Sequence, residues 1–150
     1  MNFRRISAAT VLVVDDQHSL RLLMCRTLEN GGFHVLSASN GADALTLYRG
    51  VEHAVDLLVT DYSMPGMTGL ELARKCCTLD EKLSVLYVSG SMPSDGLRAE
   101  LEAARRGFLA KPFRQSELLR SARAVLAMEP VTTPFRQNHG ARLERWSVER

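Results

Sequence analysis

The strict alternation of short apolar runs with longer amphipathic segments constrains this chain more than any other feature. The five runs are rich in Val, Leu and aromatic residues and carry few charges, as strands covered on both faces of a sheet do. They span residues 11–14, 33–38, 56–60, 83–89 and 107–111. Alternation of this kind predicts a parallel sheet whose strands are joined by crossover helices.

The amphipathic segments predict five helices. They span residues 17–30, 41–49, about 68–78, 96–106 and about 116–128. The first places four apolar side chains on one face, those of Leu20, Leu23, Met24 and Leu28. Asn40 and Asp95 suit the capping positions of the second and fourth helices. With right-handed crossovers, these elements give an open, doubly wound α/β domain.

The chain length of 150 residues fits one domain with a single packed core. We expect that domain over residues 10–128, after an N-terminal extension at 1–9. Pro130 and Pro134 should end regular structure, which leaves 129–150 as a C-terminal tail that is flexible or a linker. A helix that docks on a partner and the start of an output domain are the other interpretations of this tail.

Charge and composition exclude several classes of protein. The chain has 19 basic and 17 acidic residues, but residues 1–130 carry 15 of each, so the excess lies in the tail and no basic face for nucleic acid is expected. No segment approaches membrane-spanning length, and the apolar run after the basic start is too short for a signal peptide. The three cysteines lack metal-ligand spacing. We expect a cytoplasmic protein without nucleic-acid or membrane partners.

Polar side chains follow the predicted strands at the point where each strand ends. They are Asp15, Asp16, Asp61, Ser89 and Lys111. The carboxyl ends of parallel strands meet at one edge of the sheet, where doubly wound domains place their ligand sites. Three carboxylates brought together repel one another, so the ionised site calls for a cation, and Mg²⁺ is the natural one for oxygen ligands.

This set of groups predicts chemistry at phosphorus. Mg²⁺ takes one or two protein carboxylates together with phosphate oxygens. A carboxylate such as Asp61 can act as the nucleophile and form an aspartyl phosphate. A cation and Lys111 would neutralise the transferring group, and Ser89 would donate a hydrogen bond to it.

Four motifs at these strand ends carry a family resemblance. They read "VLVVDD", "TDYSMPGMTGLEL", "LYVSGS" and "FLAKPF". In this order and at these spacings, the chain resembles the receiver domain of two-component response regulators. The resemblance implies a flavodoxin-like (βα)5 fold with a five-stranded parallel sheet in the order 2-1-3-4-5.

The resemblance also implies roles for individual residues. Asp61 would be the phosphoacceptor, Lys111 would contact the phosphoryl group, and Asp15 and Asp16 would bind Mg²⁺ together with Asp61. The backbone carbonyl of Ser63 would be a further metal ligand.

Ser89 and Phe108 would form the conformational switch. In the family, such a hydroxyl moves toward the phosphoryl group and the aromatic ring rotates inward behind it. Since Phe108 has no hydroxyl to anchor either rotamer, its bias would rest on packing alone.

The resulting hypothesis is a signalling domain rather than an enzyme with external substrates. It would catalyse only its own phosphoryl transfer and dephosphorylation. A histidine kinase or phosphotransfer protein would supply the phosphoryl group, and the signal would pass to a downstream protein target or an output domain outside this chain. A homodimer through the fourth helix, fifth strand and fifth helix is a family habit that adds one further partner.

Three alternatives stay open from the sequence. A degenerate receiver would bind proteins without phosphorylation. A Mg²⁺-dependent phosphohydrolase with an aspartyl nucleophile would usually need a second Asp at position 63, where this chain has Ser63. The chain could also be a receiver from a hybrid kinase, although Met1 lies ten residues before the first predicted strand and favours a stand-alone regulator.

Overall fold

The computed structural model describes residues 8–51, 54–103 and 105–128. Its strands are β1 (Thr10–Val14), β2 (His34–Ala38), β3 (Leu57–Asp61), β4 (Ser84–Ser89) and β5 (Arg106–Ala110). Its helices are α1 (His18–Asn30), α2 (Gly41–Gly50), α3 (Gly69–Leu79), α4 (Asp95–Leu101) and α5 (Gln115–Leu126). The predicted tail lies outside the described residues, as does most of the predicted N-terminal extension.

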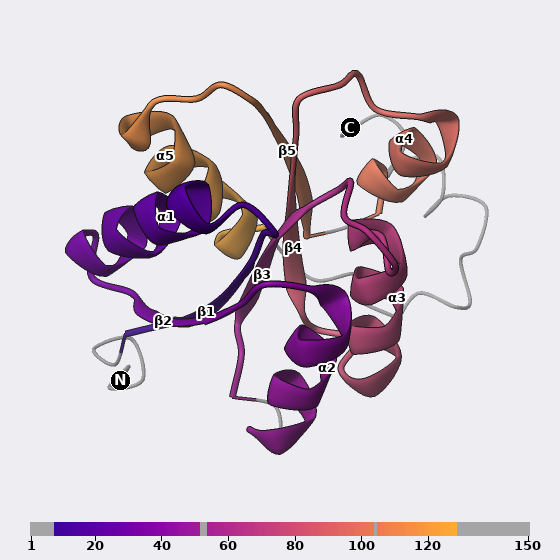
Figure 1. Cartoon of the computed structure of the whole chain (residues 1–150), viewed down its shortest axis with the longest axis horizontal. Coiled ribbons are helices and arrows are strands. Elements are labelled where there is room, and N and C mark those ends of the chain that lie inside the picture. Colours follow the sequence, from indigo (N-terminus) through magenta and orange to yellow (C-terminus); the bar gives the residue numbers. More distant parts are fainter. Residues whose placement is uncertain (1–7, 52–53, 104, 129–150) are drawn as a thin grey trace, which may run out of the picture.

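The strands form one parallel sheet in the order β2-β1-β3-β4-β5, which confirms the expected strand order. Helices α1 and α5 cover one face of the sheet, and α2, α3 and α4 cover the other (Figure 1). The register pairs Val14 of β1 with Thr60 of β3, and Asp61 with Val88 of β4. The carboxyl ends of the central strands therefore finish level with one another.

Each face of the sheet packs into its own apolar core. On the α1 and α5 face, Met24 and Leu28 meet Leu118 and Val125 over the strand side chains. Strands β1, β3 and β4 are buried along almost their whole length, because helices cover both of their faces. The expectation of double coverage is wrong for β2 and β5, since these edge strands remain partly exposed.

Local sequence signals explain where α2 and α3 begin. The Asn40 side chain accepts a hydrogen bond from the Asp43 backbone at 2.7 Å, as predicted for the cap of α2. Thr68 and Glu71 form a reciprocal capping box at the start of α3.

The prediction that Leu23 lies on the inward face of α1 is wrong: this residue is 39% exposed, because it lies toward the solvent side of the helix.

The fourth helix differs from the prediction of residues 96–106. It ends at Leu101, and its cap is Ser94, whose side chain accepts from the Leu97 backbone at 3.1 Å. The alanine-rich and glutamate-rich sequence favours a longer helix. Strand β5 must nevertheless begin at Arg106 to pair with Val85, so the chain turns through Arg105 at a φ of 64°. Pairing in the sheet overrides helix propensity here.

A charged network inside the fold ties α4 to the sheet. The Arg106 Nε lies 2.6 Å from the Glu100 carboxylate, and both side chains are largely buried. The hydroxyl of Tyr87 also donates to that carboxylate at 3.5 Å, and the Arg106 Nη2 contacts the Cys77 Sγ at 3.2 Å. The network joins α3, β4, α4 and β5. Because Leu97 is the only fully buried residue of α4, these polar contacts provide much of the attachment of this helix to the sheet.

We predict that Glu100→Ala destabilises the protein by about 2 kcal/mol. The substitution removes the acceptor that Arg106 and Tyr87 share, and the loss of the carboxylate beside a largely buried guanidinium costs more than an ordinary hydrogen bond. Urea unfolding followed by circular dichroism measures the change. Glu29→Ala, which removes an exposed glutamate from α1, is the control and should change stability by less than about 0.5 kcal/mol. Equal losses in the two variants would contradict the prediction.

Candidate functional site

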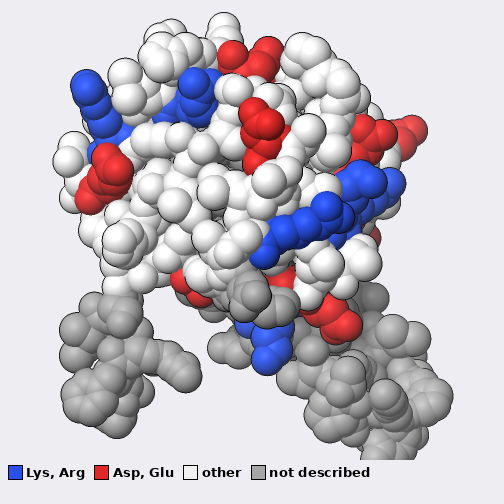
Figure 2. Space-filling model, turned by 60° about the horizontal axis from the view of Figure 1, so that its bottom comes forward, with Lys and Arg blue, Asp and Glu red and all other residues white. Residues whose placement is uncertain are grey.

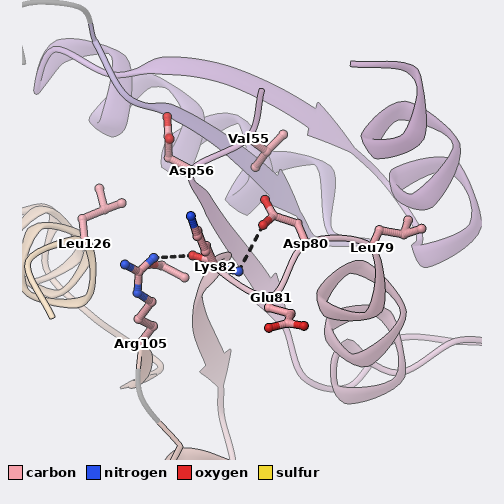
Figure 3. Close-up of a pocket in the computed structure, with 9 residues that line it drawn as sticks. Val55, Asp56, Leu79, Asp80, Glu81, Lys82, Arg105 and Leu126 are labelled. Atoms are coloured by element: carbon pink, nitrogen blue, oxygen red, sulfur yellow. Dashed lines mark hydrogen bonds between the residues drawn. The ribbon is translucent and has the colours of Figure 1, made fainter. Parts of the chain in front are cut away.

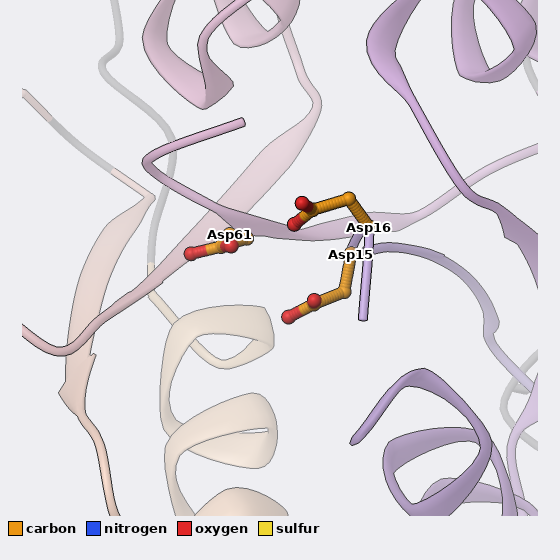
Figure 4. A group of neighbouring side chains, drawn as sticks. All are labelled: Asp15, Asp16 and Asp61. Atoms are coloured by element: carbon orange, nitrogen blue, oxygen red, sulfur yellow. The ribbon is translucent and has the colours of Figure 1, made fainter. Parts of the chain in front are cut away.

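Three carboxylates meet at the carboxyl edge of the sheet. Asp61 is the last residue of β3, and Asp15 and Asp16 follow β1, the neighbouring strand. One carboxylate oxygen from each of the three lies within 4.8 Å of the others. Figure 4 shows Asp15 and Asp16 extending toward the side of Asp61. The structure thus brings together the acidic residues that the sequence placed at one edge.

Lys111 supplies the positive charge of the site. It follows β5, and its Nζ lies 3.3 Å from Oδ1 of Asp61 and 3.5 Å from Oδ2 of Asp15. Asp15 is fully buried and Asp61 is 6% exposed, whereas Asp16 is exposed to solvent. The peptide bond between Lys111 and Pro112 is cis.

The electrostatics of the site favour binding of a cation. Burial raises the pKa of Asp61 above its ordinary value, and the neighbouring charge of Asp15 raises it further. Lys111 and a hydrogen bond from the Ser63 backbone act in the opposite direction but do not compensate. A divalent cation would relieve this repulsion, and an oxygen-only set of ligands suits Mg²⁺. The residues present therefore fit the metal that the sequence predicted.

The loop after Asp61 is shaped by two glycines. Gly66 has a φ of +84°, a conformation that side-chain-bearing residues rarely adopt. A Cβ on Gly69 would overlap the carbonyl oxygen of Asp61, so only glycine lets α3 begin this close to β3. The Gly69 backbone closes the loop by donating to the carbonyl of Tyr62 at 2.9 Å. This geometry leaves Ser63 exposed beside the carboxylates.

The predicted switch residues lie on neighbouring strands. Ser89 ends β4 and is 5% exposed, and its hydroxyl accepts from the Ser91 backbone at 3.1 Å. The Ser89 carbonyl also accepts from the Lys111 backbone at 2.8 Å, which couples the ends of β4 and β5. Phe108 of β5 is partly buried and packs into the core under α3 and α4.

Sequence reasoning missed two contacts that support the site. The Arg21 guanidinium donates to the carbonyl oxygen of Asp15 at 2.8 Å. The hydroxyl of Tyr62, the residue after Asp61, lies 3.0 Å from that of Ser94, the cap of α4. A helix that begins at His18 brings Arg21 back over Asp15, which a sequence argument could have found. The Tyr62 contact spans 32 residues and leaves no local signal.

Other surfaces of the described structure show no comparable arrangement. A pocket of about 690 Å³ lies at the opposite, amino-terminal edge of the sheet, where Arg105 donates to the carbonyl of Lys82 (Figure 3). Its lining mixes carboxylates such as Asp56 and Asp80 with these two cations. Basic and acidic side chains lie interspersed on the face in Figure 2, so its described residues form no extended surface of one sign. No helix among the described residues is long and apolar enough to cross a bilayer.

Comparison with known proteins agrees with this geometry. The sequence model of the response regulator receiver domain matches residues 11–123. The chain belongs to this family. Response regulator receiver protein CpdR of Brucella abortus is 32% identical over 117 residues, which cover 77% of this chain and 95% of CpdR. Receiver domains are signalling domains of two-component systems, and they bind Mg²⁺ at their acidic pocket.

Relatives place this domain both alone and within larger proteins. The sensor kinase CckA of Brucella abortus is 33% identical over 79% of this chain, but the match covers only 13% of CckA. A crystal structure of response regulator TrrA from Thermotoga maritima, in complex with Mg²⁺ and BeF, has 25% sequence identity and a TM-score of 0.65. The match covers 78% of this chain and 98% of that protein. Receiver domains interact with histidine kinases or phosphotransfer proteins and with output domains.

We predict that Asp61→Asn raises the stability of the metal-free protein by about 1 kcal/mol. The substitution removes a buried charge close to Asp15; two like charges about 4 Å apart repel by about 1 kcal/mol with full water screening, and the Lys111 ammonium offsets part of any larger repulsion. Urea unfolding in EDTA at neutral pH measures the gain. Because the pKa of Asp61 is raised in the folded state, this carboxyl destabilises the wild type only as the pH rises above ordinary carboxyl pKa values. The stability gained by Asp61→Asn should therefore shrink in acid.

The exposed Asp95 provides the control for this prediction. Asp95→Asn should change the stability of the metal-free protein little in either direction. A metal-free wild type more stable than Asp61→Asn would show that the three carboxylates are not in repulsion.

A second prediction concerns the loop after Asp61. Gly69→Ala should destabilise the protein by about 3 kcal/mol, because the new methyl group displaces α3 from the end of β3. Thermal unfolding compares it with Gly50→Ala, where no heavy atom lies within 4 Å of the added Cβ. The control should be neutral or slightly stabilising, since alanine lowers the entropy of the unfolded chain. If the two alanines were tolerated equally, the close approach at Gly69 would be refuted.

Proposed function

We propose that this protein accepts a phosphoryl group on Asp61 from a histidine kinase or phosphotransfer protein, and signals by a conformational change. The observation that carries the proposal is the position of the Asp61 carboxylate. It ends a buried central strand, lies 3.3 Å from the Lys111 ammonium and lies close to two further carboxylates. The domain would span residues 10–128.

The residues of the chain have separate roles in the proposed transfer. An oxygen of Asp61 attacks phosphorus, and the bond between phosphorus and the donor nitrogen breaks as the new bond forms. The Lys111 ammonium, which pairs with the free Asp61 carboxylate, then neutralises the negative charge on the phosphoryl oxygens. Buried strand β3 holds the nucleophile in place, and the glycine loop after it leaves room for the incoming group.

Asp15, Asp16, Asp61 and the backbone carbonyl of Ser63 would hold Mg²⁺. When bound, the ion supplies charge neutralisation for the transferring phosphoryl group. The complex of TrrA with Mg²⁺ and BeF supports this assignment by analogy, because the folds match over most of both chains. The close approach of three carboxylates supports it independently.

The proposed switch acts on α4. The hydroxyl of Ser89 turns toward the phosphoryl group, and Phe108 follows into the space behind it. Phe108 and Arg106 leave β5 on the same face because they are two residues apart, and Arg106 holds α4 through Glu100. The Tyr62 contact with Ser94 holds the other end of α4 to the residue after Asp61. Packing therefore sets the preferred orientation of the Phe108 ring, and the polar contacts of Arg106 and Tyr62 link that orientation to the position of α4.

The partners follow from the same assignment. The protein acts in the cytoplasm, where a histidine kinase or phosphotransfer protein supplies the phosphoryl group and a downstream protein or an output domain receives the signal. A homodimer through α4, β5 and α5 is one form that the signalling state can take. The two rivals are a receiver that binds proteins without phosphorylation and an aspartyl-nucleophile phosphohydrolase.

The test combines Mg²⁺ and acetyl phosphate with intact-protein mass spectrometry. We predict that the wild type gains the mass of one phosphoryl group and that Asp61→Asn gains none. Lys111→Met should form the adduct far more slowly, by about a hundredfold or more, because the transferring charge is then neutralised by metal alone. Lys82→Met removes an exposed lysine at the opposite edge of the sheet and serves as the matched control.

Each rival predicts a different result in this experiment. Continued release of inorganic phosphate from varied monoesters, without a stable adduct, would favour the phosphohydrolase. A wild type that binds Mg²⁺ but stays unmodified by acetyl phosphate and by active histidine kinases would leave the phosphorylation-independent binding domain. EDTA should abolish the adduct on the present proposal.

A further inference from the structure

Arg21 makes a contact that the proposed chemistry does not use. It is the fourth residue of α1, and its Nη1 donates to the carbonyl oxygen of Asp15 at 2.8 Å. Its Nη2 lies 3.1 Å from Nδ1 of His18, which orients the guanidinium from the other side. Arg21 thus reaches back from the helix to the end of β1, where the acidic pair begins.

The carbonyl of Asp15 needs such a partner. Asp15 is fully buried, and the paired part of β1 ends one residue earlier, at Val14. A buried carbonyl that leaves the sheet must find another donor. Arg21 supplies a charged one. Without it, this peptide unit would have to rotate to reach water or another donor.

That peptide unit controls the aim of both acidic residues. Its carbonyl belongs to Asp15 and its nitrogen to Asp16, so a rotation would redirect both side chains. The Asp15 carboxylate is held as well, by the Gln17 backbone at 2.8 Å and by Lys111 at 3.5 Å. The Asp15 backbone N–H donates to the carbonyl of Ala38 at 3.4 Å, and the arginine contact holds the other side of the residue, at the carbonyl of the peptide that leads to Asp16.

We propose that Arg21 is a positioning residue for the metal site: by fixing the peptide between Asp15 and Asp16, it sets the geometry of the carboxylates that bind Mg²⁺. The inference rests on the proposed function, because it assumes a cation among these carboxylates. It assigns to the first helix a part in metal selectivity. Mg²⁺ requires near-ideal octahedral geometry, whereas Ca²⁺ tolerates irregular arrangements of oxygen ligands.

Charge alone predicts the opposite effect. A cationic side chain near a metal site repels the metal, so replacing Arg21 by a neutral residue should tighten the binding of any divalent ion. Loss of positioning should instead weaken binding, and weaken Mg²⁺ more than Ca²⁺. The sign of the change and its dependence on the ion therefore separate the two effects.

The experiment measures Mg²⁺ and Ca²⁺ dissociation constants of the full chain by isothermal titration calorimetry. For Arg21→Met, we expect the Mg²⁺ constant to rise about tenfold, the usual size of an effect on residues that orient metal ligands. The Ca²⁺ constant should rise less, so the preference for Mg²⁺ falls. Arg21→Lys keeps a charged donor and should recover part of the Mg²⁺ affinity. Should Arg21→Met not fold, Arg21→Gln makes the same comparison.

Arg26→Met is the matched control, because it removes an exposed arginine from the same helix. It should leave both constants nearly unchanged. Tighter or unchanged Mg²⁺ binding in Arg21→Met would overturn the inference, and so would an equal loss for both ions. A wild type that takes up phosphate on Asp61 while Arg21→Met behaves in one of these ways refutes the positioning role alone. A wild type that binds neither ion refutes the metal site and the inference together.

Discussion

The repulsion among Asp15, Asp16 and Asp61 is the constraint on which the rest of the structure depends. Their carboxylates come within 4.8 Å of one another only because β1 and β3 are neighbours in a parallel sheet and end level. Both strands are buried on both faces, so apolar packing far from the site supplies the free energy that holds the charges together. The site therefore brings like charges together on a rigid frame, an arrangement that suits the binding of a cation.

Helix α4 stands in contrast to this rigid centre. It has seven residues and buries only Leu97 fully. Polar contacts hold its two ends, one from Tyr62 to Ser94 and one from Arg106 to Glu100. A position of α4 that separated Arg106 from Glu100 would break a largely buried ion pair, which is strongly destabilising. A helix held in this way is suited to two discrete positions rather than a continuous range.

Periodicity was sufficient to predict a parallel sheet with crossover helices, because apolar runs of four to seven residues between helical segments admit few other topologies, whereas the strand order came from the family resemblance. Periodicity also predicted that the side chains of the site meet at one edge of the sheet, where Asp15 and Lys111 directly follow β1 and β5 and Asp61 ends β3. Prediction failed after Leu101, where the local preference for helix is strong and the pairing of Arg106 with Val85 shortens α4. It failed again at the contact of Glu100 with Arg106. In the sequence these two residues have the character of surface charges, and only the fold shows that they are largely buried and paired.

The charge balance of the site explains why the contact of Arg21 matters. Three carboxylates against the single ammonium of Lys111 leave two negative charges, which a divalent cation matches. If the guanidinium of Arg21 faced the carboxylates, it would cancel one of them and weaken the case for a metal. It faces the carbonyl of Asp15 instead, so its hydrogen bond orients the ligands while its charge stays outside the cluster. Two basic side chains thereby have separate effects: Arg21 orients the carboxylates, and Lys111 sets the charge of the site.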